Sequence, residues 1–364
     1  MLDSAFWAGR RVLLTGHTGF KGSWLLLWLQ QLGARVWGYA LEPEGSPNLF
    51  SALALEAGGG GGAGFVHQIG DLADAAALAE LVQRCQPEVL LHLAAQPLVR
   101  RSYQDPLGTW ATNVNGSLHL LEALRPLSHP CAVVMVTTDK VYENREWAYG
   151  YREPDRLGGH DPYSASKAAA EIAIASWRQS FCGKGVHQTP HLRIATARAG
   201  NVIGGGDWAA DRIVPDAMRA LAAGEPIGVR NPWATRPWQH VLEPLGGYLR
   251  LAEALALDPE PPCEAFNFGP SLASNRPVQE LVSTMLRHWP GQWVDQSDPA
   301  APHEANLLHL QIDKAHHRLG WQPRWDYTST VQRTVEWYRQ HHQGRSALEC
   351  CLADLASYQW SDQR

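Results

Sequence analysis

The chain has 364 residues, of which 45% are hydrophobic and 18% charged, and its formal net charge at pH 7 is -5. This composition is typical of a globular protein with a large core, and it gives no electrostatic reason to expect nucleic acid or an anionic membrane as a partner. The N-terminal region shows neither a signal-peptide pattern nor an apolar stretch long enough to span a bilayer, and the six cysteines are scattered without metal-ligand spacing. We therefore expect reduced thiols, no metal site and a cytoplasmic location.

The first elements have the order strand, glycine-rich turn, helix. Residues 10–15 predict a strand, residues 16–22 read Gly-His-Thr-Gly-Phe-Lys-Gly, and residues 23–32 are apolar enough for a buried helix. In a dinucleotide fold the first glycine makes the tight turn, the second lets the backbone approach the pyrophosphate, and the third allows close helix–strand packing. The sequence therefore predicts a cofactor site, with a plain turn as the alternative, at Gly16, His17, Thr18, Gly19, Phe20, Lys21 and Gly22.

The second predicted strand, residues 35–40, bears on the choice of cofactor. An acid that would bind a free ribose 2′-hydroxyl is expected at its end, and here Glu42 comes late and displaced. No Lys or Arg lies between Val36 and Gln83, which argues against a clamp for a 2′-phosphate from this side. Lys21 is the one basic residue in the glycine turn that could serve NADP. Because no other basic residue is near, the sequence favours NAD.

The next elements complete the predicted cofactor site. Residues 46–64, with a glycine run at 58–62, predict a flexible surface insertion. Strands at 65–70 and 88–93, with a helix at 78–85 between them, would place Asp71 and Leu72 at the adenine edge and Ala94, Ala95 and Gln96 beside the nicotinamide ribose. A long helix is predicted at 106–124; Asn113 inside it is either solvated or hydrogen-bonded across to another strand.

The centre of the predicted site runs from residue 133 to residue 167. An apolar strand at 133–136 delivers Thr138, Asp139 and Lys140 to its C-terminal end, where ligands bind in parallel α/β sheets. Tyr163 and Lys167 follow with i, i+4 spacing, which puts them on one face of a helix at 163–181. We expect the Lys167 ammonium to lower the pKa of Tyr163 enough to make the phenol a usable base.

The remainder of the chain predicts a strand at 192–197, a helix at 211–223 and short strands at 226–229 and near Phe266. Helices follow at 278–288, 313–319 and 327–342. The segment 230–240 contains two arginines and two tryptophans, which fit either a diphosphate clamp or a structural loop. The pattern predicts an α/β protein with a Rossmann-type doubly wound parallel sheet in residues 1–200, joined by elements from about 230–270, and a smaller mixed α/β substrate lobe in 201–364.

These residues together resemble the extended branch of the short-chain dehydrogenase/reductase family. The motifs at 16–22, Asp71, Ala94-Ala95-Gln96, Asn113 and Tyr163/Lys167 stand in the order of that family. Thr138-Asp139-Lys140 is similar to the Thr-Asp-Glu of the sugar-nucleotide 4,6-dehydratases. Its Asp-Lys pair, with His-Thr-Gly-Phe-Lys-Gly, Pro-Leu-Val-Arg-Arg-Ser-Tyr and Thr-Arg-Pro-Trp-Gln-His-Val, resembles those members that act on CDP-glucose.

The resemblance implies an NAD-dependent lyase that dehydrates a nucleotide sugar without net redox change. Tyr163 would take the proton of the 4-hydroxyl while Thr138 and Lys167 assist it. Asp139 would protonate the leaving 6-hydroxyl, and Lys140 would remove the C5 proton, which requires a neutral amine. The resemblance also implies substrate contacts at Ser102, Asn201, Arg212, Arg230, Arg236 and His240.

Two other functions stay open on the sequence. An epimerase or reductase on the same fold would not need Asp139 and Lys140, and a non-catalytic dinucleotide sensor would be free to lose Tyr163 or Lys167. Asp139 and Lys140 would then be an ion pair at a strand end. The family resemblance further implies a homodimer or homotetramer built on the helices at 106–124 and 163–181.

Overall fold

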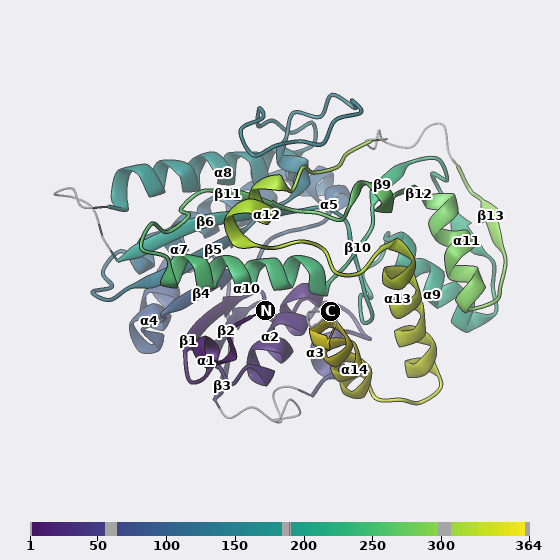
Figure 1. Cartoon of the computed structure of the whole chain (residues 1–364), viewed down its shortest axis with the longest axis horizontal. Helices are drawn as coiled ribbons and strands as arrows, with labels where there is room; N and C mark the ends of the chain where they lie inside the picture. Colours follow the sequence, from purple (N-terminus) through teal and green to yellow (C-terminus); the bar gives the residue numbers. More distant parts are fainter. Residues whose placement is uncertain (1, 55–63, 184–188, 190, 298–306, 361–364) are drawn as a thin grey trace.

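The computed structural model of the chain describes residues 2–54, 64–183, 189, 191–297 and 307–360 (Figure 1). The glycine run at 58–62 lies outside the described residues. At the centre of the fold is a seven-stranded sheet with the order β11-β6-β5-β4-β1-β2-β3, in which all neighbouring strands are parallel. Its strands are Arg11–Thr15 (β1), Arg35–Ala40 (β2), Phe65–Ile69 (β3), Val89–His92 (β4), Cys131–Val136 (β5), Leu192–Ala199 (β6) and Ala265–Phe268 (β11).

The strand order reverses between β1 and β4, which confirms the predicted doubly wound α/β fold. Alternate residues of the strands feed two hydrophobic layers, because successive side chains of a strand point to opposite faces. Leu13, Leu90 and Val133 pack with α4 (Ala75–Cys85), α7 (Gly116–Leu124) and α8 (Pro162–Phe181). Val12, Leu91 and Val134 pack with α2 (Phe20–Gln31) and α10 (Leu242–Leu257) on the other face. Ligands of such sheets bind at the reversal point, at the carboxyl ends of the strands.

A second lobe follows β6, built from two-stranded ribbons and helices (Figure 1). Val202–Ile203 (β7) pairs with Gln239–His240 (β10), Ile227–Val229 (β8) with Trp293–Asp295 (β13), and Thr235–Pro237 (β9) with Asn275–Pro277 (β12). Its helices are Ile213–Ala223 (α9), Val278–His288 (α11), Asp313–Leu319 (α12) and Tyr327–His342 (α13). The predicted bounds of α11, α12 and α13 are confirmed to the residue.

Two helical features differ from the predictions. The helix predicted at 106–124 is interrupted by a π turn at Ala111–Asn115 (η2), which separates Pro106–Trp110 (α6) from α7. A C-terminal helix, Ala347–Trp360 (α14), was absent from the predicted elements. Shorter helices complete the described chain at Ser4–Trp7 (α1), Leu49–Ala52 (α3), Val99–Gln104 (α5), Asp139–Val141 (η3) and Leu272–Ser274 (η4).

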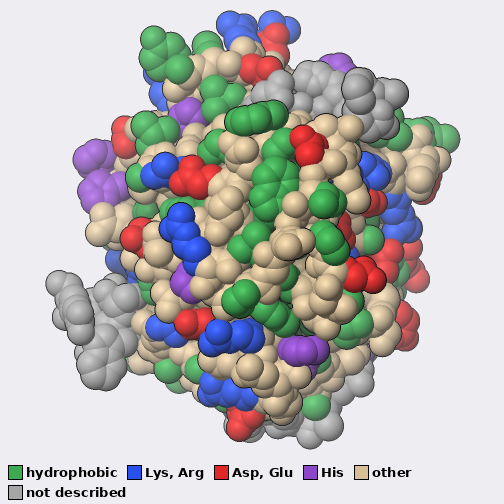
Figure 2. All heavy atoms as spheres, turned by 90° about the vertical axis from the view of Figure 1, so that its right-hand side faces the viewer, with side chains coloured by type: hydrophobic (Ala, Val, Ile, Leu, Met, Phe, Trp, Pro, Cys, Tyr) green, Lys and Arg blue, Asp and Glu red, His purple; other side chains and the backbone are tan. Residues whose placement is uncertain are grey.

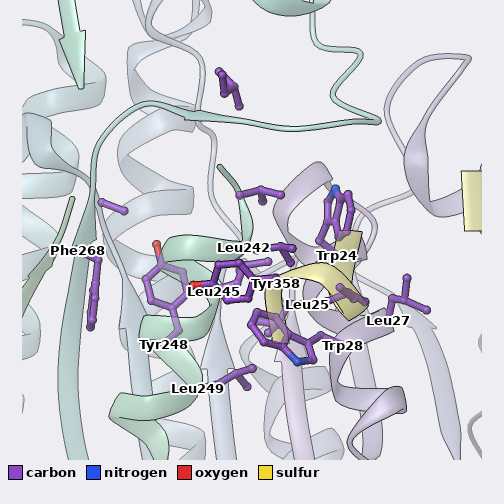
Figure 3. Packing of buried hydrophobic residues seen from close by; sticks show 14 of the residues in the cluster. Trp24, Leu25, Leu27, Trp28, Leu242, Leu245, Tyr248, Leu249, Phe268 and Tyr358 are labelled. Carbon is purple, nitrogen blue, oxygen red and sulfur yellow. The ribbon is translucent and has the colours of Figure 1, made fainter. Parts of the chain in front are cut away.

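Three helices that are distant in sequence meet in the core shown in Figure 3. Trp24 and Trp28 of α2 lie beside Leu245 and Leu249 of α10, and α14 contributes Tyr358. The Trp28 and Tyr358 rings stand edge to face with centroids 5.7 Å apart. Two of the chain's sixteen tryptophans thus lie in the core where these helices meet.

On the face seen in Figure 2, basic and acidic side chains are interspersed, in keeping with the small net charge. Within the described ranges, no helix is both long and apolar enough to cross a membrane. A search of the same residues finds no group of three His, Cys, Asp or Glu side chains that could hold a metal ion.

Candidate active site

The glycine turn connects β1 to α2 and leaves no room for larger residues at two of its three glycines. Gly16 has a positive φ of 77°, and a Cβ there would come within 2.6 Å of the Ala94 backbone nitrogen. A Cβ at Gly22 would overlap the Gly16 carbonyl oxygen, whereas a Cβ at Gly19 would meet nothing closer than 3.5 Å. Helix α2 begins at Phe20, three residues earlier than predicted, with no side chain capping it. Its free N–H groups beside the open backbone at Gly19 fit the pyrophosphate of a dinucleotide.

The side chain of His17 faces away from this turn, contrary to its predicted place in the cofactor site. It is fully buried beneath β2, with Nε2 2.6 Å from Nδ1 of His67 and its ring against Phe50 and Phe65. Burial and the neighbouring His67 lower the pKa of His17 to about 3, so the imidazole is neutral. Thr18 is also engaged elsewhere, since its hydroxyl donates to the Leu41 carbonyl. Only the backbone at these two positions is therefore available to a cofactor.

Lys21, the one basic residue of the glycine turn, lies among the catalytic side chains rather than at the end of β2. Its Nζ is 6.0 Å from the centre of the Tyr248 ring. The pKa of Lys21 is lowered to about 8, mainly by burial and also by the charges of Arg212 and Lys167, while the charge of Asp139 acts in the opposite direction.

At the adenine edge, Asp71 is exposed and its carboxylate accepts a hydrogen bond from the Ala73 nitrogen, while Leu72 is buried. Toward the nicotinamide end, Asn113 sits in the π turn and holds the loop after β4. Its Oδ1 accepts from Gln96 N at 2.9 Å, and its Nδ2 donates to Ser166 of α8 at 2.9 Å. Asn113 is 1% exposed, so it is not solvated; its hydrogen bonds go to a loop and a helix rather than to the strand that the second alternative predicted. Such π turns are frequent at functional sites.

Thr138 and Asp139 emerge from β5 into the site. The Thr138 hydroxyl donates to Asp139 Oδ1 at 3.0 Å, and Asp139 is 3% exposed. Its other oxygen, Oδ2, has no hydrogen-bond partner among the described residues. Burial raises the pKa of Asp139 above its ordinary value, against the lowering charges of Lys140, Arg236 and Lys21. A raised pKa suits a carboxyl group that must donate a proton. Lys140 is half-buried.

Tyr163 and Lys167 lie on the first two turns of α8, and both are buried. Burial raises the pKa of Tyr163 to about 12, while the Thr138 hydrogen bond and the charge of Arg212 act to lower it. The prediction that Lys167 lowers the pKa of Tyr163 below its ordinary value is therefore wrong. Lys167 Nζ lies 3.4 Å from the Val136 carbonyl, and burial lowers its own pKa to about 8.

The helix that carries Tyr163 and Lys167 is fixed by a buried ion pair one turn further along. Glu171 accepts from Arg198 Nε at 2.9 Å and from Arg198 Nη2 at 2.8 Å, and from the hydroxyls of Thr137 and Thr196 at 2.6 and 2.8 Å. Arg198 also donates to the Tyr142 hydroxyl, which in turn bonds Asn267 of β11. The network thus links α8 to three strands of the sheet.

The predicted substrate residues fall into two groups. Arg212 and Arg236 lie near the catalytic side chains, because the charge of Arg212 acts on Tyr163 and that of Arg236 on Asp139. Arg212 is also paired with Asp207 at 2.9 Å. Arg230 is half-exposed and paired with Asp211 at 2.6 Å, and Asn201 is exposed.

Two of the predicted substrate residues are fully buried. The His240 ring packs between Trp24 and Trp325, with centroids 6.0 and 4.8 Å away. Ser102 is also fully buried, and its hydroxyl donates to the Val99 carbonyl of its own helix.

Residues 12–269 match the NAD dependent epimerase/dehydratase family. The chain belongs to this family. It is 43% identical over 360 residues to CDP-glucose 4,6-dehydratase of Salmonella typhimurium, an alignment that covers 98% of each protein. A dTDP-glucose 4,6-dehydratase of Xanthomonas campestris is 28% identical, with 90% of this chain and 92% of the relative covered.

Solved structures show the same fold. The dTDP-glucose 4,6-dehydratase DesIV of Streptomyces venezuelae, solved with NAD bound, superposes with a TM-score of 0.75 over 93% of this chain and 99% of its own, at 23% identity. A UDP-glucose 4-epimerase of Stenotrophomonas maltophila, also with NAD bound, gives 0.78 over 92% and 100%, at 22% identity. NAD is the cofactor of the family, and the open glycine turn fits its pyrophosphate.

One residue near the chemistry was missed in the sequence. Tyr248 is fully buried on α10, and the charges of Tyr163 and Asp139 both reach its hydroxyl. Its position in an apolar helix gave no signal, because a tyrosine among leucines reads as core. Tyr248 comes near these residues only because α10 packs against β5, the strand that leads to Thr138 and Asp139.

Proposed function

We propose that this protein is an NAD-dependent CDP-glucose 4,6-dehydratase, which converts CDP-D-glucose to CDP-4-dehydro-6-deoxy-D-glucose and water. The observation that carries the proposal is the buried carboxyl of Asp139, with its raised pKa, close to Tyr163. Oxidation of a sugar hydroxyl needs a base but no acid, whereas loss of water needs a proton donor for the leaving oxygen. The 43% identity to a CDP-glucose 4,6-dehydratase over 98% of the chain supports the same reaction and the same sugar nucleotide.

In the first step Tyr163 removes the proton of the 4-hydroxyl. NAD, held at its pyrophosphate by the backbone of the glycine turn, would supply reversible hydride transfer for C4 and C6 of the sugar. Thr138 hydrogen-bonds Tyr163, and the charge of Arg212 also lowers the pKa of that phenol. These groups favour the phenolate that burial disfavours. The Lys167 ammonium would donate a hydrogen bond to the cofactor ribose.

In the second step the 4-ketone makes the C5 proton acidic, and Lys140 removes it. Asp139 gives its proton to the 6-hydroxyl, the C6–O bond breaks, and water leaves. Lys140 then returns the proton to C5 when hydride is added at C6. Burial keeps Asp139 protonated further up the pH scale than an ordinary carboxyl. Arg236, with Arg212, binds the diphosphate of the substrate through charge-assisted hydrogen bonds.

Purified protein with NAD should turn CDP-glucose into a 4-keto-6-deoxy sugar, detected by its absorbance in base and by a mass loss of one water. Parallel reactions with dTDP-, UDP- and GDP-glucose test the nucleotide. A product of unchanged mass with an inverted hydroxyl would instead identify an epimerase. Absence of any product, with NAD bound, would favour a dinucleotide sensor.

We further propose a homodimer built on α5, α6 and α8. These helices pack together, and their outer surface presents the large apolar side chains of Tyr103, Leu107, Trp110 and Ile172, which are 50, 82, 41 and 60% exposed. Burying such a surface stabilises association. Leu107→Glu should convert a dimer to a monomer in light scattering. A monomeric wild type would refute the proposal.

A cytoplasmic location is proposed as well, supported by six cysteines that are all free.

A further inference from the structure

Tyr248 differs from the other buried tyrosines of the described chain. The hydroxyls of Tyr39, Tyr142, Tyr151, Tyr327, Tyr338 and Tyr358 each donate a hydrogen bond to a named protein atom, and Tyr163 is bonded to Thr138. The Tyr248 hydroxyl has no such partner among the described residues, although its side chain is fully buried. A buried hydroxyl left without a partner is costly, and in a folded protein it is usually satisfied by a ligand or water.

The position of this hydroxyl is fixed by packing. Gly247, its neighbour on α10, lies so close to Phe268 that a Cβ there would overlap the ring. The Tyr248 ring stands edge to face with Phe268, at a centroid distance of 5.7 Å and an angle of 81°. Figure 3 shows its hydroxyl pointing away from Leu249 and Trp28. The phenol is therefore held by its ring alone, with its polar end directed out of the apolar cluster.

The groups that surround this polar end are those of the proposed chemistry. Lys21 Nζ lies 6.0 Å from the ring centre. Burial, and to a lesser extent the charges of Tyr163 and Asp139, raises the pKa of Tyr248, so the group is a neutral O–H donor. Asp139 Oδ2 is also without a partner, and Gly200 is so close that a Cβ there would be 2.9 Å from it. Two polar atoms near the proposed chemistry, Asp139 Oδ2 and the Tyr248 hydroxyl, thus lack a partner among the described residues.

We propose that Tyr248 is a further catalytic residue, whose hydroxyl donates a hydrogen bond to the 6-oxygen of the sugar beside Asp139. The inference rests on the proposed dehydration. As the C6–O bond breaks, negative charge develops on the leaving oxygen. Asp139 supplies the proton that turns it into water, and Tyr248 stabilises the charge without giving up its own proton. In this proposal the 6-oxygen gives Asp139 Oδ2 and the Tyr248 hydroxyl the partner that each lacks among the described residues.

The test is Tyr248→Phe, which removes only the hydroxyl. Since that hydroxyl bonds no described protein group, the variant should melt at the wild-type temperature or higher. Turnover of CDP-glucose should fall roughly 100-fold, as for removal of one donor to a developing negative charge. The oxidation step should survive, so reduced nicotinamide should accumulate in a single turnover. Tyr327→Phe is the matched control, because its hydroxyl bonds Thr284 away from the site; it should lose some stability and keep its turnover.

A second substrate separates this role from a loss of packing. CDP-6-deoxyglucose has no 6-oxygen and can undergo only the oxidation at C4, so Tyr248→Phe should reduce NAD with this substrate at the wild-type rate. Slower oxidation of CDP-6-deoxyglucose by the variant, or full turnover of CDP-glucose by it, would overturn the proposal. Failure of the wild type to dehydrate CDP-glucose would instead overturn the proposed function, and this inference with it.

Discussion

The ion pair between Glu171 and Arg198 gives the sharpest prediction about how the catalytic helix is held. The two side chains are 3 and 4% exposed, and Glu171 accepts four hydrogen bonds from Arg198, Thr137 and Thr196. Glu171→Gln would leave the Arg198 guanidinium buried without its counter-charge. Breaking a buried pair by removing one partner costs about 3–5 kcal/mol. We expect a loss of that size in the free energy of unfolding, measured by urea denaturation with circular dichroism.

The pH dependence of this loss has a definite sign. Burial would raise the pKa of Glu171, but Arg198 and the two threonines outweigh it and hold the pKa below the ordinary 4.5. A depressed pKa contributes stability that is complete above the unfolded pKa and disappears as the pH falls through the folded pKa. The difference between wild type and Glu171→Gln should therefore be largest near neutral pH and shrink in acid.

The double variant Glu171→Met/Arg198→Met is the control. Replacing both charges with apolar groups of similar size is often nearly neutral, so it should be more stable than Glu171→Gln. A loss below about 1 kcal/mol for Glu171→Gln, the usual value of an exposed pair, would refute the reasoning.

Four further results are expected. Tyr163→Phe should lower turnover by about 10²–10⁴-fold, the contribution of a general base, while circular dichroism and nucleotide binding stay normal; near wild-type turnover would remove Tyr163 from the mechanism. Lys140→Met should accumulate reduced nicotinamide in a single turnover without 4-keto-6-deoxy product, and product at the normal rate would show that another group is the base. Arg236→Ala should raise KM strongly at nearly constant kcat, whereas an unchanged KM with a lower Tm would assign Arg236 to the structure of its loop. Burial raises the pKa of Glu243 to about 7, so the wild type should lose roughly 3 kcal/mol of stability relative to Glu243→Gln as the pH rises from 4.5 to 7, and parallel stability curves would contradict this.

The elements that the sequence predicted best are those with local signals. The period of the apolar residues and the flanking Gly and Pro located β2, α11, α12 and α13 to the residue. The glycine turn was predicted from its spacing after a strand; Gly22 is required by the Gly16 carbonyl within the turn, whereas Gly16 is required by the distant Ala94 backbone. The π turn at Ala111–Asn115 was missed, since it depends on Asn113 reaching Gln96 and Ser166 from two other elements.

The candidate site was predictable where side chains follow directly from a strand end or share a helix face, as for Thr138, Asp139, Tyr163 and Lys167. It was not predictable where burial decides. His240 and Ser102 stand in family motifs, but packing against Trp24 and within α5 buries them. The pKa of Tyr163 depends on how completely the fold excludes water, which i, i+4 spacing does not reveal. For the same reason, the sequence of α10 alone does not indicate that Tyr248 lies near the catalytic residues.

In the proposed reaction one hydride moves from C4 to C6 of the same sugar while water is lost. CDP-[4-²H]glucose follows this hydride, with the product examined by mass spectrometry and NMR. We predict a 4-keto-6-deoxy product that has lost one water and carries the deuterium at C6. Deuterium retained at C4 in a sugar of unchanged mass, or released into reduced nicotinamide that leaves the protein, would rule out this transfer.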